Sequence, residues 1–271
     1  MLVAVDTGGT KTLITSFSST GKPGESFKYP TPKNEHEYIA VLTEHINEHY
    51  GKKAIDAIVI GMPGVIRENR ISWGGSNLPW SNFDVATPLK AAFSCPVWIE
   101  NDANLAGLAE ARMMRKTPES ALYVTISTGI GTGIILDGHI DNGLAASEGG
   151  HSLVEYDGRV RTWESFASGK SIKRTYGKYA RDITSKAVWN QIADKISRGF
   201  LALIPVLQPQ VIIIGGSIGT YFERYYPTLK RLLAAHLPAH IDLPEIRQAA
   251  HPEEAVVYGC YYYGKDQLAN R

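Results

Sequence analysis

The apolar positions of this 271-residue chain form short runs, and several of these runs end in glycine-rich turns. Residues 2–5 are all apolar and predict a buried strand, while residues 12–17 alternate between polar and apolar, as in a second strand. Residues 6–11 between them read Asp-Thr-Gly-Gly-Thr-Lys. Because a strand and not a helix follows these glycines, the pattern predicts a hairpin, in contrast to the loops of P-loop and dinucleotide-binding folds.

The same pattern returns in the second half of the chain. Residues 121–126 predict a strand, residues 127–133 a glycine turn and residues 134–136 the returning strand. Two such units indicate an internal duplication, in which each half presents a phosphate-binding hairpin to a shared cleft. A third glycine turn begins at Gly215, directly after another apolar strand.

Strands and helices alternate through much of the remaining chain, which is typical of an α/β protein. We expect strands at residues 54–60 and 97–100, and helices at residues 38–49, 85–93, 104–115 and 253–263. Residues 71–80 show no clear period and are predicted to form a loop.

Composition excludes several classes of protein. The chain is 44% apolar with a net charge of +1 and no basic cluster, so we expect no nucleic-acid partner. Its two cysteines, Cys95 and Cys260, are too few for a disulfide framework or a cysteine-rich zinc site. No cationic leader and no apolar run near the length of a membrane span is present, so we expect a cytoplasmic protein without a membrane partner. The length suits one large domain or two lobes around a cleft.

The first hairpin has the composition of an anion site. Gly8 and Gly9 let backbone N–H groups approach an anion, and the threonines on either side add hydroxyl donors. Lys11 adds a positive charge, and Asp6 could hold a hydrated Mg²⁺ at the end of the strand. The alternative is an ordinary tight turn, which would account for two glycines but not for the acid, the hydroxyls and the lysine together.

A second candidate is Asp102, which directly follows the strand predicted at residues 97–100. A carboxylate at this end of a strand points into the crevice where open α/β sheets bind ligands, and it could take a proton from an attacking hydroxyl. Equally, Asp102 or Asn104 could cap the helix that follows and do nothing else. The spacing does not separate the two interpretations.

Three further segments carry polar side chains suited to a small polyol. Glu148 and His151 flank two glycines, although a histidine in such a place is more often structural. Glu164 lies among aromatic and small residues and is either a hydroxyl-binding acid or a charge at a helix N-terminus. Asn77 and Trp80 place an amide and an aromatic face in one loop, which suits a sugar, unless Trp80 only covers the core.

The order of these motifs is more informative than any one of them. The chain contains, in sequence, Asp-x-Gly-Gly-Thr-Lys, Gly-x-Pro-Gly, Asn-Leu-x-x-Trp, Glu-Asn-Asp-Ala-Asn, Thr-Gly-Ile-Gly-x-Gly, Glu-Gly-Gly-His and Ile-Gly-Gly-Ser. From Asp6 to about Gly259 it resembles the ROK family of bacterial sugar kinases, within the actin-like ATPase superfamily. The resemblance implies an α/β fold of two ribonuclease-H-like lobes around a central cleft. A small lobe would span residues 1–101, with a helix at about 253–271 packing back near it, and a large lobe would span residues 102–252.

The resemblance also implies an activity: transfer of the γ-phosphoryl group of ATP, with Mg²⁺, to a hydroxyl of a hexose, usually the 6-OH. Asp102 matches the general base of the family. The positions that match sugar-binding residues are Asn77, Asn101, Glu148, His151 and Glu164. The positions assigned to the nucleotide are Asp6, Gly8, Gly9, Thr10 and Lys11 in the first hairpin, Thr128, Gly129 and Gly131 in the second, and Gly215 and Gly216 in the third turn. The hexose itself, whether glucose, fructose, mannose or an N-acetylhexosamine, does not follow from one sequence.

One segment departs from the family pattern. Many ROK proteins hold a structural zinc with a histidine equivalent to His151 and three nearby cysteines. Here residues 152–163 contain no cysteine, so we expect no zinc, and we expect Tyr156 and Trp163 to hold the loop by packing.

The alternatives to a kinase are a catalytically silent sugar sensor, a non-sugar ATPase of the same superfamily, and a repressor. Repressors of the family carry a DNA-binding extension before the first hairpin, which starts here at Leu2. Homodimers are common in the family, but no stretch of this sequence demonstrates one.

Overall fold

The computed structural model describes residues 1–75, 78–252 and 254–270. The chain groups into two compact units, Met1–Ala109 with Glu253–Arg271, and Glu110–Pro252. It passes from the first unit to the second inside helix α3 (Asp102–Arg112), which follows a strand without an intervening loop. The division into lobes at residues 1–101 and 102–252 stays a prediction.

The first unit is built on a five-stranded mixed sheet in the order β3-β2-β1-β4-β8. Its strands are β1 (Leu2–Thr7), β2 (Lys11–Phe17), β3 (Pro23–Pro30), β4 (Ala57–Met62) and β8 (Val97–Asn101). β1 pairs antiparallel with β2, with Thr7 opposite Thr12, so the predicted hairpin is confirmed. On its other side β1 pairs parallel with β4, which in turn pairs parallel with β8.

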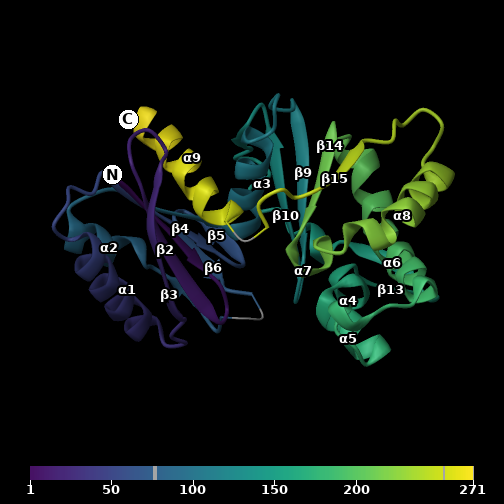
Figure 1. The fold of residues 1–271 in the computed structure, drawn as a ribbon, viewed down its shortest axis with the longest axis horizontal. Helices are drawn as coiled ribbons and strands as arrows, with labels where there is room; N and C mark the ends of the chain where they lie inside the picture. The colour runs from purple at the N-terminus through teal and green to yellow at the C-terminus, as the bar shows by residue number, and fades with distance from the viewer. Residues whose placement is uncertain (76–77, 253, 271) are drawn as a thin grey trace. The chain divides into compact units, whose positions relative to one another are not determined.

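Helices cover both faces of this sheet (Figure 1). Helix α1 (Glu35–Tyr50) begins after Asn34, whose side chain accepts a hydrogen bond from the Glu37 N–H, and it packs with α2 (Ala86–Phe93) in a common core with Val3 and Val5. Helix α9 (Ala255–Ala269) covers the opposite face against β1 and β4. Because both faces are buried, β1 and β4 read as continuous apolar runs rather than alternating ones.

The second unit repeats the topology. Its sheet has the order β11-β10-β9-β14-β15, with strands β9 (Ser120–Ile126), β10 (Ile130–Leu136), β11 (His139–Ile140), β14 (Val211–Gly215) and β15 (Glu245–Gln248). As in the first unit, the first strand pairs antiparallel with the second and parallel with a strand from much later in the chain. The predicted duplication is therefore visible in both strand order and strand direction.

Two long helices that we did not predict complete the second core. They are α6 (Lys186–Leu207) and α8 (Phe222–His236), which pack on each other. Trp189 from α6 and Tyr225 from α8 are among the fully buried side chains there. Within the described residues, no helix is both long and apolar enough to cross a membrane.

Short elements connect these layers. In the first unit they are β5 (Val65–Arg67), β6 (Arg70–Trp73) and β7 (Ser81–Phe83). In the second they are β12 (Leu153–Tyr156), β13 (Arg159–Thr162), α4 (Glu164–Ala167), α5 (Gly169–Tyr176), α7 (Gly216–Gly219) and two 3-10 turns, Gly149–His151 and Ala180–Asp182. The prediction of a loop at residues 71–80 is wrong at its start, because Ile71 is buried in β6 opposite Phe83. A strand with one inward residue has too few positions to show a period.

Helix α9 approaches α3 more closely than any side chain would allow. A Cβ added at Gly259 would overlap the carbonyl oxygen and Cα of Leu105, which are backbone atoms and cannot move aside. We therefore expect Gly259→Ala to destabilise the protein by roughly 1–2 kcal/mol or more, even though alanine is the better helix former by about 1 kcal/mol. Urea unfolding measures this, with Lys265→Ala on the exposed face of α9 as the control. A gain in stability for Gly259→Ala would contradict the close packing.

Candidate active site

The turn of the first hairpin is held by the segment that follows β3. The Gly8 N–H donates to the Lys11 carbonyl at 3.0 Å, and the Thr31 hydroxyl donates to the Gly8 carbonyl at 2.8 Å. The Lys33 ammonium donates to the Gly9 carbonyl. Neither glycine has a positive φ, so their small size serves close approach to the backbone rather than an unusual turn conformation. With its carbonyls bonded in this way, the turn is fixed in place.

Asp6 is the last but one residue of β1 and interacts electrostatically with Asp102. Burial, and to a smaller extent the negative charge of Asp102, raises the pKa of the Asp6 carboxyl to about 7, while Lys28 acts in the opposite direction. The first unit thus brings together two acids that are 96 positions apart in the sequence. Neighbouring carboxylates that repel each other are relieved by a divalent cation, and Mg²⁺ prefers such oxygen ligands. The residues present therefore fit the expected Mg²⁺.

Asn101, rather than Asp102 or Asn104, makes the main cap of helix α3. Its Oδ1 accepts hydrogen bonds from the N–H groups of Ala103 at 2.8 Å and Asn104 at 3.1 Å. Its Nδ2 donates to the Gly64 carbonyl at 2.8 Å. An amide has two donor hydrogens, so one remains for a ligand. Asp102 is the first residue of the helix, and its Oδ1 accepts a hydrogen bond from the Ala103 N–H at 2.8 Å.

Glu100 stabilises the junction between β8 and α3 through hydrogen bonds. It is buried, and its Oε1 accepts from the Asn101 N–H at 2.8 Å and from Asn104 Nδ2 at 2.9 Å. Burial raises the pKa of Glu100, while these two hydrogen bonds act in the opposite direction. Asn104 thereby connects the first turn of α3 to the end of β8, and this contact fixes the position of the Asp102 backbone.

In the second unit, three predicted sugar-binding residues lie together. His151 Nδ1 and Glu148 Oε2 are 3.2 Å apart, and burial raises the pKa of Glu148, with His151 opposing the shift and Glu164 adding to it. Glu164 Oε2 accepts a hydrogen bond from the Ile130 N–H at 2.8 Å. A Cβ on Gly129 would collide with the same Glu164 oxygen. The acid cluster and the second glycine turn are therefore one structure.

The glycines of Glu-Gly-Gly-His serve packing. A Cβ on Gly150 would overlap the Ile130 carbonyl, and the Gly149 N–H donates to the Thr132 hydroxyl at 3.0 Å. The turn Gly149–His151 thus lies directly on β10, while the His151 side chain keeps 42% of its surface exposed. The second hairpin turn is also shorter than predicted: β10 already begins at Ile130, and Gly131 lies within it, opposite Thr125.

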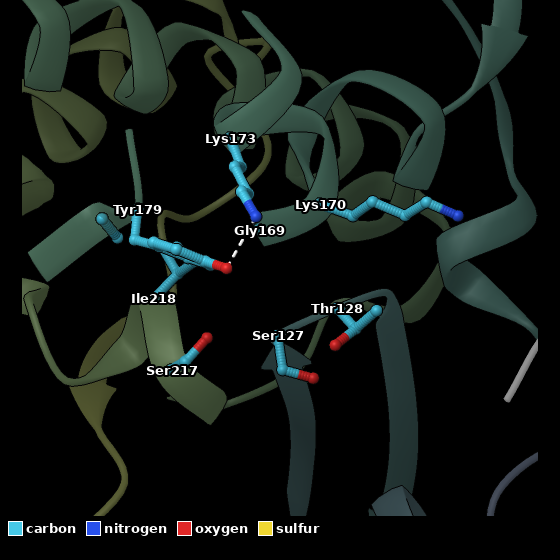
Figure 2. Close-up of a pocket in the computed structure, with 9 residues that line it drawn as sticks. Ser127, Thr128, Gly169, Lys170, Lys173, Tyr179, Ser217 and Ile218 are labelled. Carbon is cyan, nitrogen blue, oxygen red and sulfur yellow. Dashed lines mark hydrogen bonds between the residues drawn. The ribbon is translucent and has the colours of Figure 1, made fainter. Parts of the chain in front are cut away.

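A cavity of about 300 Å³ opens beside this turn (Figure 2). Its walls come from the turn after β9, from α5, from α7 and from the 3-10 turn near Tyr179, and its lining residues are Ser127, Thr128, Gly169, Lys170, Lys173, Tyr179, Ala180, Ser217 and Ile218. Lys173 Nζ donates to the Tyr179 hydroxyl at 2.6 Å. The Gly169 N–H donates to the Ser127 carbonyl at 2.6 Å, which joins the start of α5 to the turn. Two lysines and four hydroxyl-bearing residues line this cavity, and such a lining suits a phosphorylated ligand.

Sequence reasoning found Thr128 but missed Lys170, Lys173 and Tyr179. The two lysines sit at i and i+3 of a helix whose cap, Ser168, accepts from the Ser171 N–H. A serine in a capping position before these lysines was the feature of the sequence that could have predicted this helix. Gly215 and Gly216 are absent from the lining, and at Gly216 the φ of +77° and a Cβ position 2.6 Å from the Ile126 carbonyl both require glycine. They place Ser217 at the cavity.

Asn77 lies outside the described residues. Trp80, its partner in the predicted sugar loop, is buried in the first core against Tyr38, and its indole N–H donates to the Lys33 carbonyl at 2.8 Å. It therefore covers the core and presents no face to a ligand.

The cysteine-free segment 152–163 forms the hairpin β12–β13. Tyr156 stacks on Phe166 with ring centroids 4.5 Å apart, and Trp163 is fully buried, donating its indole N–H to the Lys195 carbonyl at 3.1 Å. Packing by the two predicted side chains is confirmed.

The sequence model of the ROK family matches residues 2–267. A fructokinase from Pediococcus pentosaceus is 27% identical over 264 residues, which cover 91% of this chain and 90% of that protein. A glucokinase from Halalkalibacterium halodurans is also 27% identical, covering 98% and 95%. The crystal structure of a ROK family glucokinase from Streptomyces griseus in complex with glucose and AMPPNP has a TM-score of 0.81 at 20% identity, covering 98% of this chain and 99% of its own. The predicted α/β fold of ribonuclease-H-like, actin-like ATPase lobes is confirmed.

The raised pKa of Asp6 predicts a pH-dependent stability. An unfolded aspartate has a pKa near 3.8, whereas folded Asp6 has a pKa of about 7. The stability gained by keeping Asp6 protonated in the fold is therefore fully present below pH 3.8 and is lost as the pH rises through about 7. Asp6→Asn has no such loss. Without Mg²⁺ or nucleotide, its stability relative to wild type should grow between pH 5 and pH 8 by as much as about 2–3 kcal/mol.

Urea unfolding at a series of pH values measures this difference. Glu44→Gln, an exposed acid of the same unit, is the control and should show none. A pH-independent difference for Asp6→Asn would mean that Asp6 ionises without cost.

Proposed function

Because the chain belongs to the ROK family, we propose that it is a sugar kinase that transfers the γ-phosphoryl group of ATP to a hexose hydroxyl, with the 6-OH as acceptor. The observation that carries the proposal is the contact between Glu164 and the turn at Gly129. Hydroxyl-binding acids and a phosphate-binding turn share one small structure, and a kinase must hold a polyol and a phosphate chain together. Relatives that bear the names fructokinase and glucokinase support the same class.

Asp102 is proposed as the general base. As the acceptor oxygen forms its bond to the γ-phosphorus, the bond from that phosphorus to the bridging oxygen of ADP breaks, and the hydroxyl proton passes to the Asp102 carboxylate. Mg²⁺, when bound, would supply positive charge at the phosphate groups. Asp6, at the end of β1, would hold the hydrated ion, which accounts for two adjacent acids.

The nucleotide is proposed to bind the glycine turns and the adjacent cavity. Gly8, Gly9, Thr10 and Lys11 would contact phosphates from the first unit. In the second unit, Thr128 lines the cavity with Lys170 and Lys173, whose ammonium groups suit phosphate oxygens. Gly129, Gly131, Gly215 and Gly216 would act through the position of their backbone.

The sugar is proposed to bind Glu148, His151 and Glu164 through its ring hydroxyls, with Asn101 donating its remaining amide hydrogen. Asn77 stays a further ligand predicted from the sequence alone. A carboxylate that accepts from a hydroxyl, paired with an imidazole that can donate or accept, can orient a polyol through its hydroxyl groups. The substrate class is therefore a hexose: glucose or a related one such as fructose, mannose or an N-acetylhexosamine.

A coupled ADP-release assay with a panel of hexoses tests the proposal against its rivals. Release that depends on one or more hexoses supports a kinase. Release without any sugar would indicate an ATPase, and sugar binding without release would indicate a sensor.

Asp102→Asn should retain hexose binding, because the amide keeps the shape of the carboxylate. Its kcat should fall by at least roughly 100-fold, because the amide cannot accept the proton. Hexose binding by calorimetry and kcat by coupled assay separate the two effects, with Glu44→Gln as the control. Turnover close to wild type would refute the base assignment.

Lys173→Met should raise the KM for ATP by about tenfold, the loss of one charge-assisted hydrogen bond to phosphate, while the KM for the hexose stays within error. Lys230→Met, an exposed lysine of the same unit, provides the matched control. An equal rise in both KM values would indicate damage to the fold rather than loss of a nucleotide contact.

A further inference from the structure

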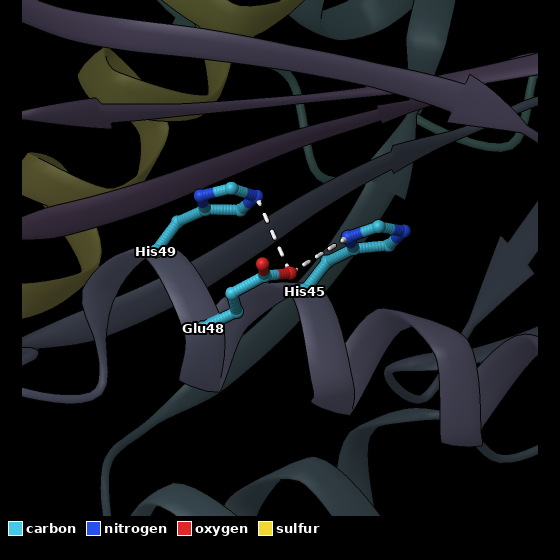
Figure 3. Close-up of side chains that lie close together, drawn as sticks. All are labelled: His45, Glu48 and His49. Carbon is cyan, nitrogen blue, oxygen red and sulfur yellow. Dashed lines mark ion pairs between the residues drawn. The ribbon is translucent and has the colours of Figure 1, made fainter.

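A cluster of potential metal ligands lies on helix α1, and none of its residues takes part in the proposed reaction. His45, Glu48 and His49 occupy positions i, i+3 and i+4, so they share one face of the helix. The Glu48 carboxylate lies between the two imidazoles (Figure 3). Its Oε2 is 3.9 Å from His45 Nδ1 and 3.8 Å from His49 Nε2, and the three donor atoms all lie within 4.8 Å of one another.

The two imidazoles are already fixed in orientation by aromatic side chains of β3. His49 stacks on Phe27 with ring centroids 3.4 Å apart and an interplanar angle of 11°. His45 packs against Tyr29 with centroids 4.3 Å apart. The side chains of His45 and His49 are 30% and 22% exposed, whereas Glu48 is 65% exposed and can adjust. Ordered ligands lose little conformational freedom on binding an ion.

One of the donor atoms has no hydrogen-bond partner. Among the buried side-chain nitrogens and oxygens of the described residues, His45 Nδ1 is one of a few without one. A buried imidazole nitrogen in this condition is destabilising unless something binds it. A metal ion between His45 and Glu48 would bind it.

We propose that His45, Glu48 and His49 form a binding site for a divalent transition-metal ion of the Zn²⁺ class. Two imidazoles and one carboxylate suit Zn²⁺ and its neighbours, whereas Mg²⁺ prefers oxygen ligands, so the metal of ATP would not compete for the site. Donors of a tetrahedral Zn²⁺ lie about 3.3 Å apart. From donor atoms that lie within 4.8 Å of one another, binding therefore needs a rotation of the exposed Glu48 carboxylate and a small approach of the two imidazole nitrogens. Three protein ligands leave the fourth position to water.

This site differs from the zinc considered for residues 152–163, which lie in the other unit. All three ligands here belong to one helix and one compact unit, so the site does not depend on how the two units are arranged. An ion there would hold both imidazoles against Phe27 and Tyr29, and so would stabilise the contact between α1 and β3.

Calorimetric titration of the chelator-treated full chain with Zn²⁺, in excess Mg²⁺, tests the proposal. We expect one site per chain in the wild type. His49→Phe keeps an aromatic ring on Phe27 but lacks the donor nitrogen, and Glu48→Gln changes only an exposed carboxylate. Each should weaken Zn²⁺ binding by at least about tenfold.

Two variants of the same helix are matched controls: His36→Phe and Glu44→Gln, both at exposed positions outside the cluster. They should bind Zn²⁺ as the wild type does. Thermal unfolding gives an independent readout, because Zn²⁺ should raise the Tm of the wild type and of both controls but not that of His49→Phe. Absence of one-site binding in the wild type, unchanged affinity in both cluster variants, or an equal loss in His36→Phe would overturn the proposal.

Discussion

The parallel pairing of strands that are distant in the sequence positions Asp6 and the start of α3 in the first unit, and the glycine turns in the second. In the first unit, the hydrogen-bonded register places Asp6 opposite Gly61, and Gly61 opposite Glu100, so one row across the sheet ends at the start of α3. In the second unit, the corresponding row contains Gly131, Thr125 and Gly215. The two units therefore share the same strand pairing but differ in side chains, because Thr125 occupies the position in the second unit that Asp6 occupies in the first. A shift of either ladder by one residue would turn these side chains to the other face of the sheet.

Each unit contains a pair of acids whose negative charges repel each other, Asp6 with Asp102 and Glu148 with Glu164. The two units offset this repulsion in different ways. Asp6 is destabilised by burial and by Asp102, with only Lys28 in opposition, which leaves a role for a divalent cation. In the second unit, burial and the charge of Glu164 raise the pKa of Glu148, but His151 pairs with Glu148 and opposes this shift. Glu164 itself accepts a hydrogen bond from the Ile130 N–H. One acid pair is therefore balanced internally, and the other is suited to an added ion. Burying the Asp6 carboxylate costs folding stability, and groups with such perturbed pKa values are often retained for function.

Much of the local structure followed from the sequence. The hairpins were predictable because an apolar strand, a glycine turn and a second strand leave few alternatives. Helix α1 was predictable from the helical spacing of apolar residues within 38–49, although it begins earlier, at Glu35 after the cap Asn34. The sequence could not separate the two roles of Asp102. The structure assigns the main cap of α3 to Asn101, which also bonds Gly64, a residue that only the fold brings near. The role of Asp102 as a base stays a proposal. Trp80 was ambiguous for a similar reason, because burial and ligand stacking require the same aromatic side chain.

By itself, then, the sequence determined the α/β class, the internal duplication, the glycine turns and the set of acids from which a site could be built, because these depend on spacing and side-chain chemistry along the chain. The tertiary structure decided which groups lie together: Asp6 with Asp102, and Glu164 with Gly129. It also added Lys173 and Tyr179, which line the same cavity as Thr128. It also showed that Gly129 is needed for the approach of Glu164, and Gly150 for packing on β10. These facts are set by contacts between segments far apart in the chain, and such contacts leave no periodic trace in the sequence.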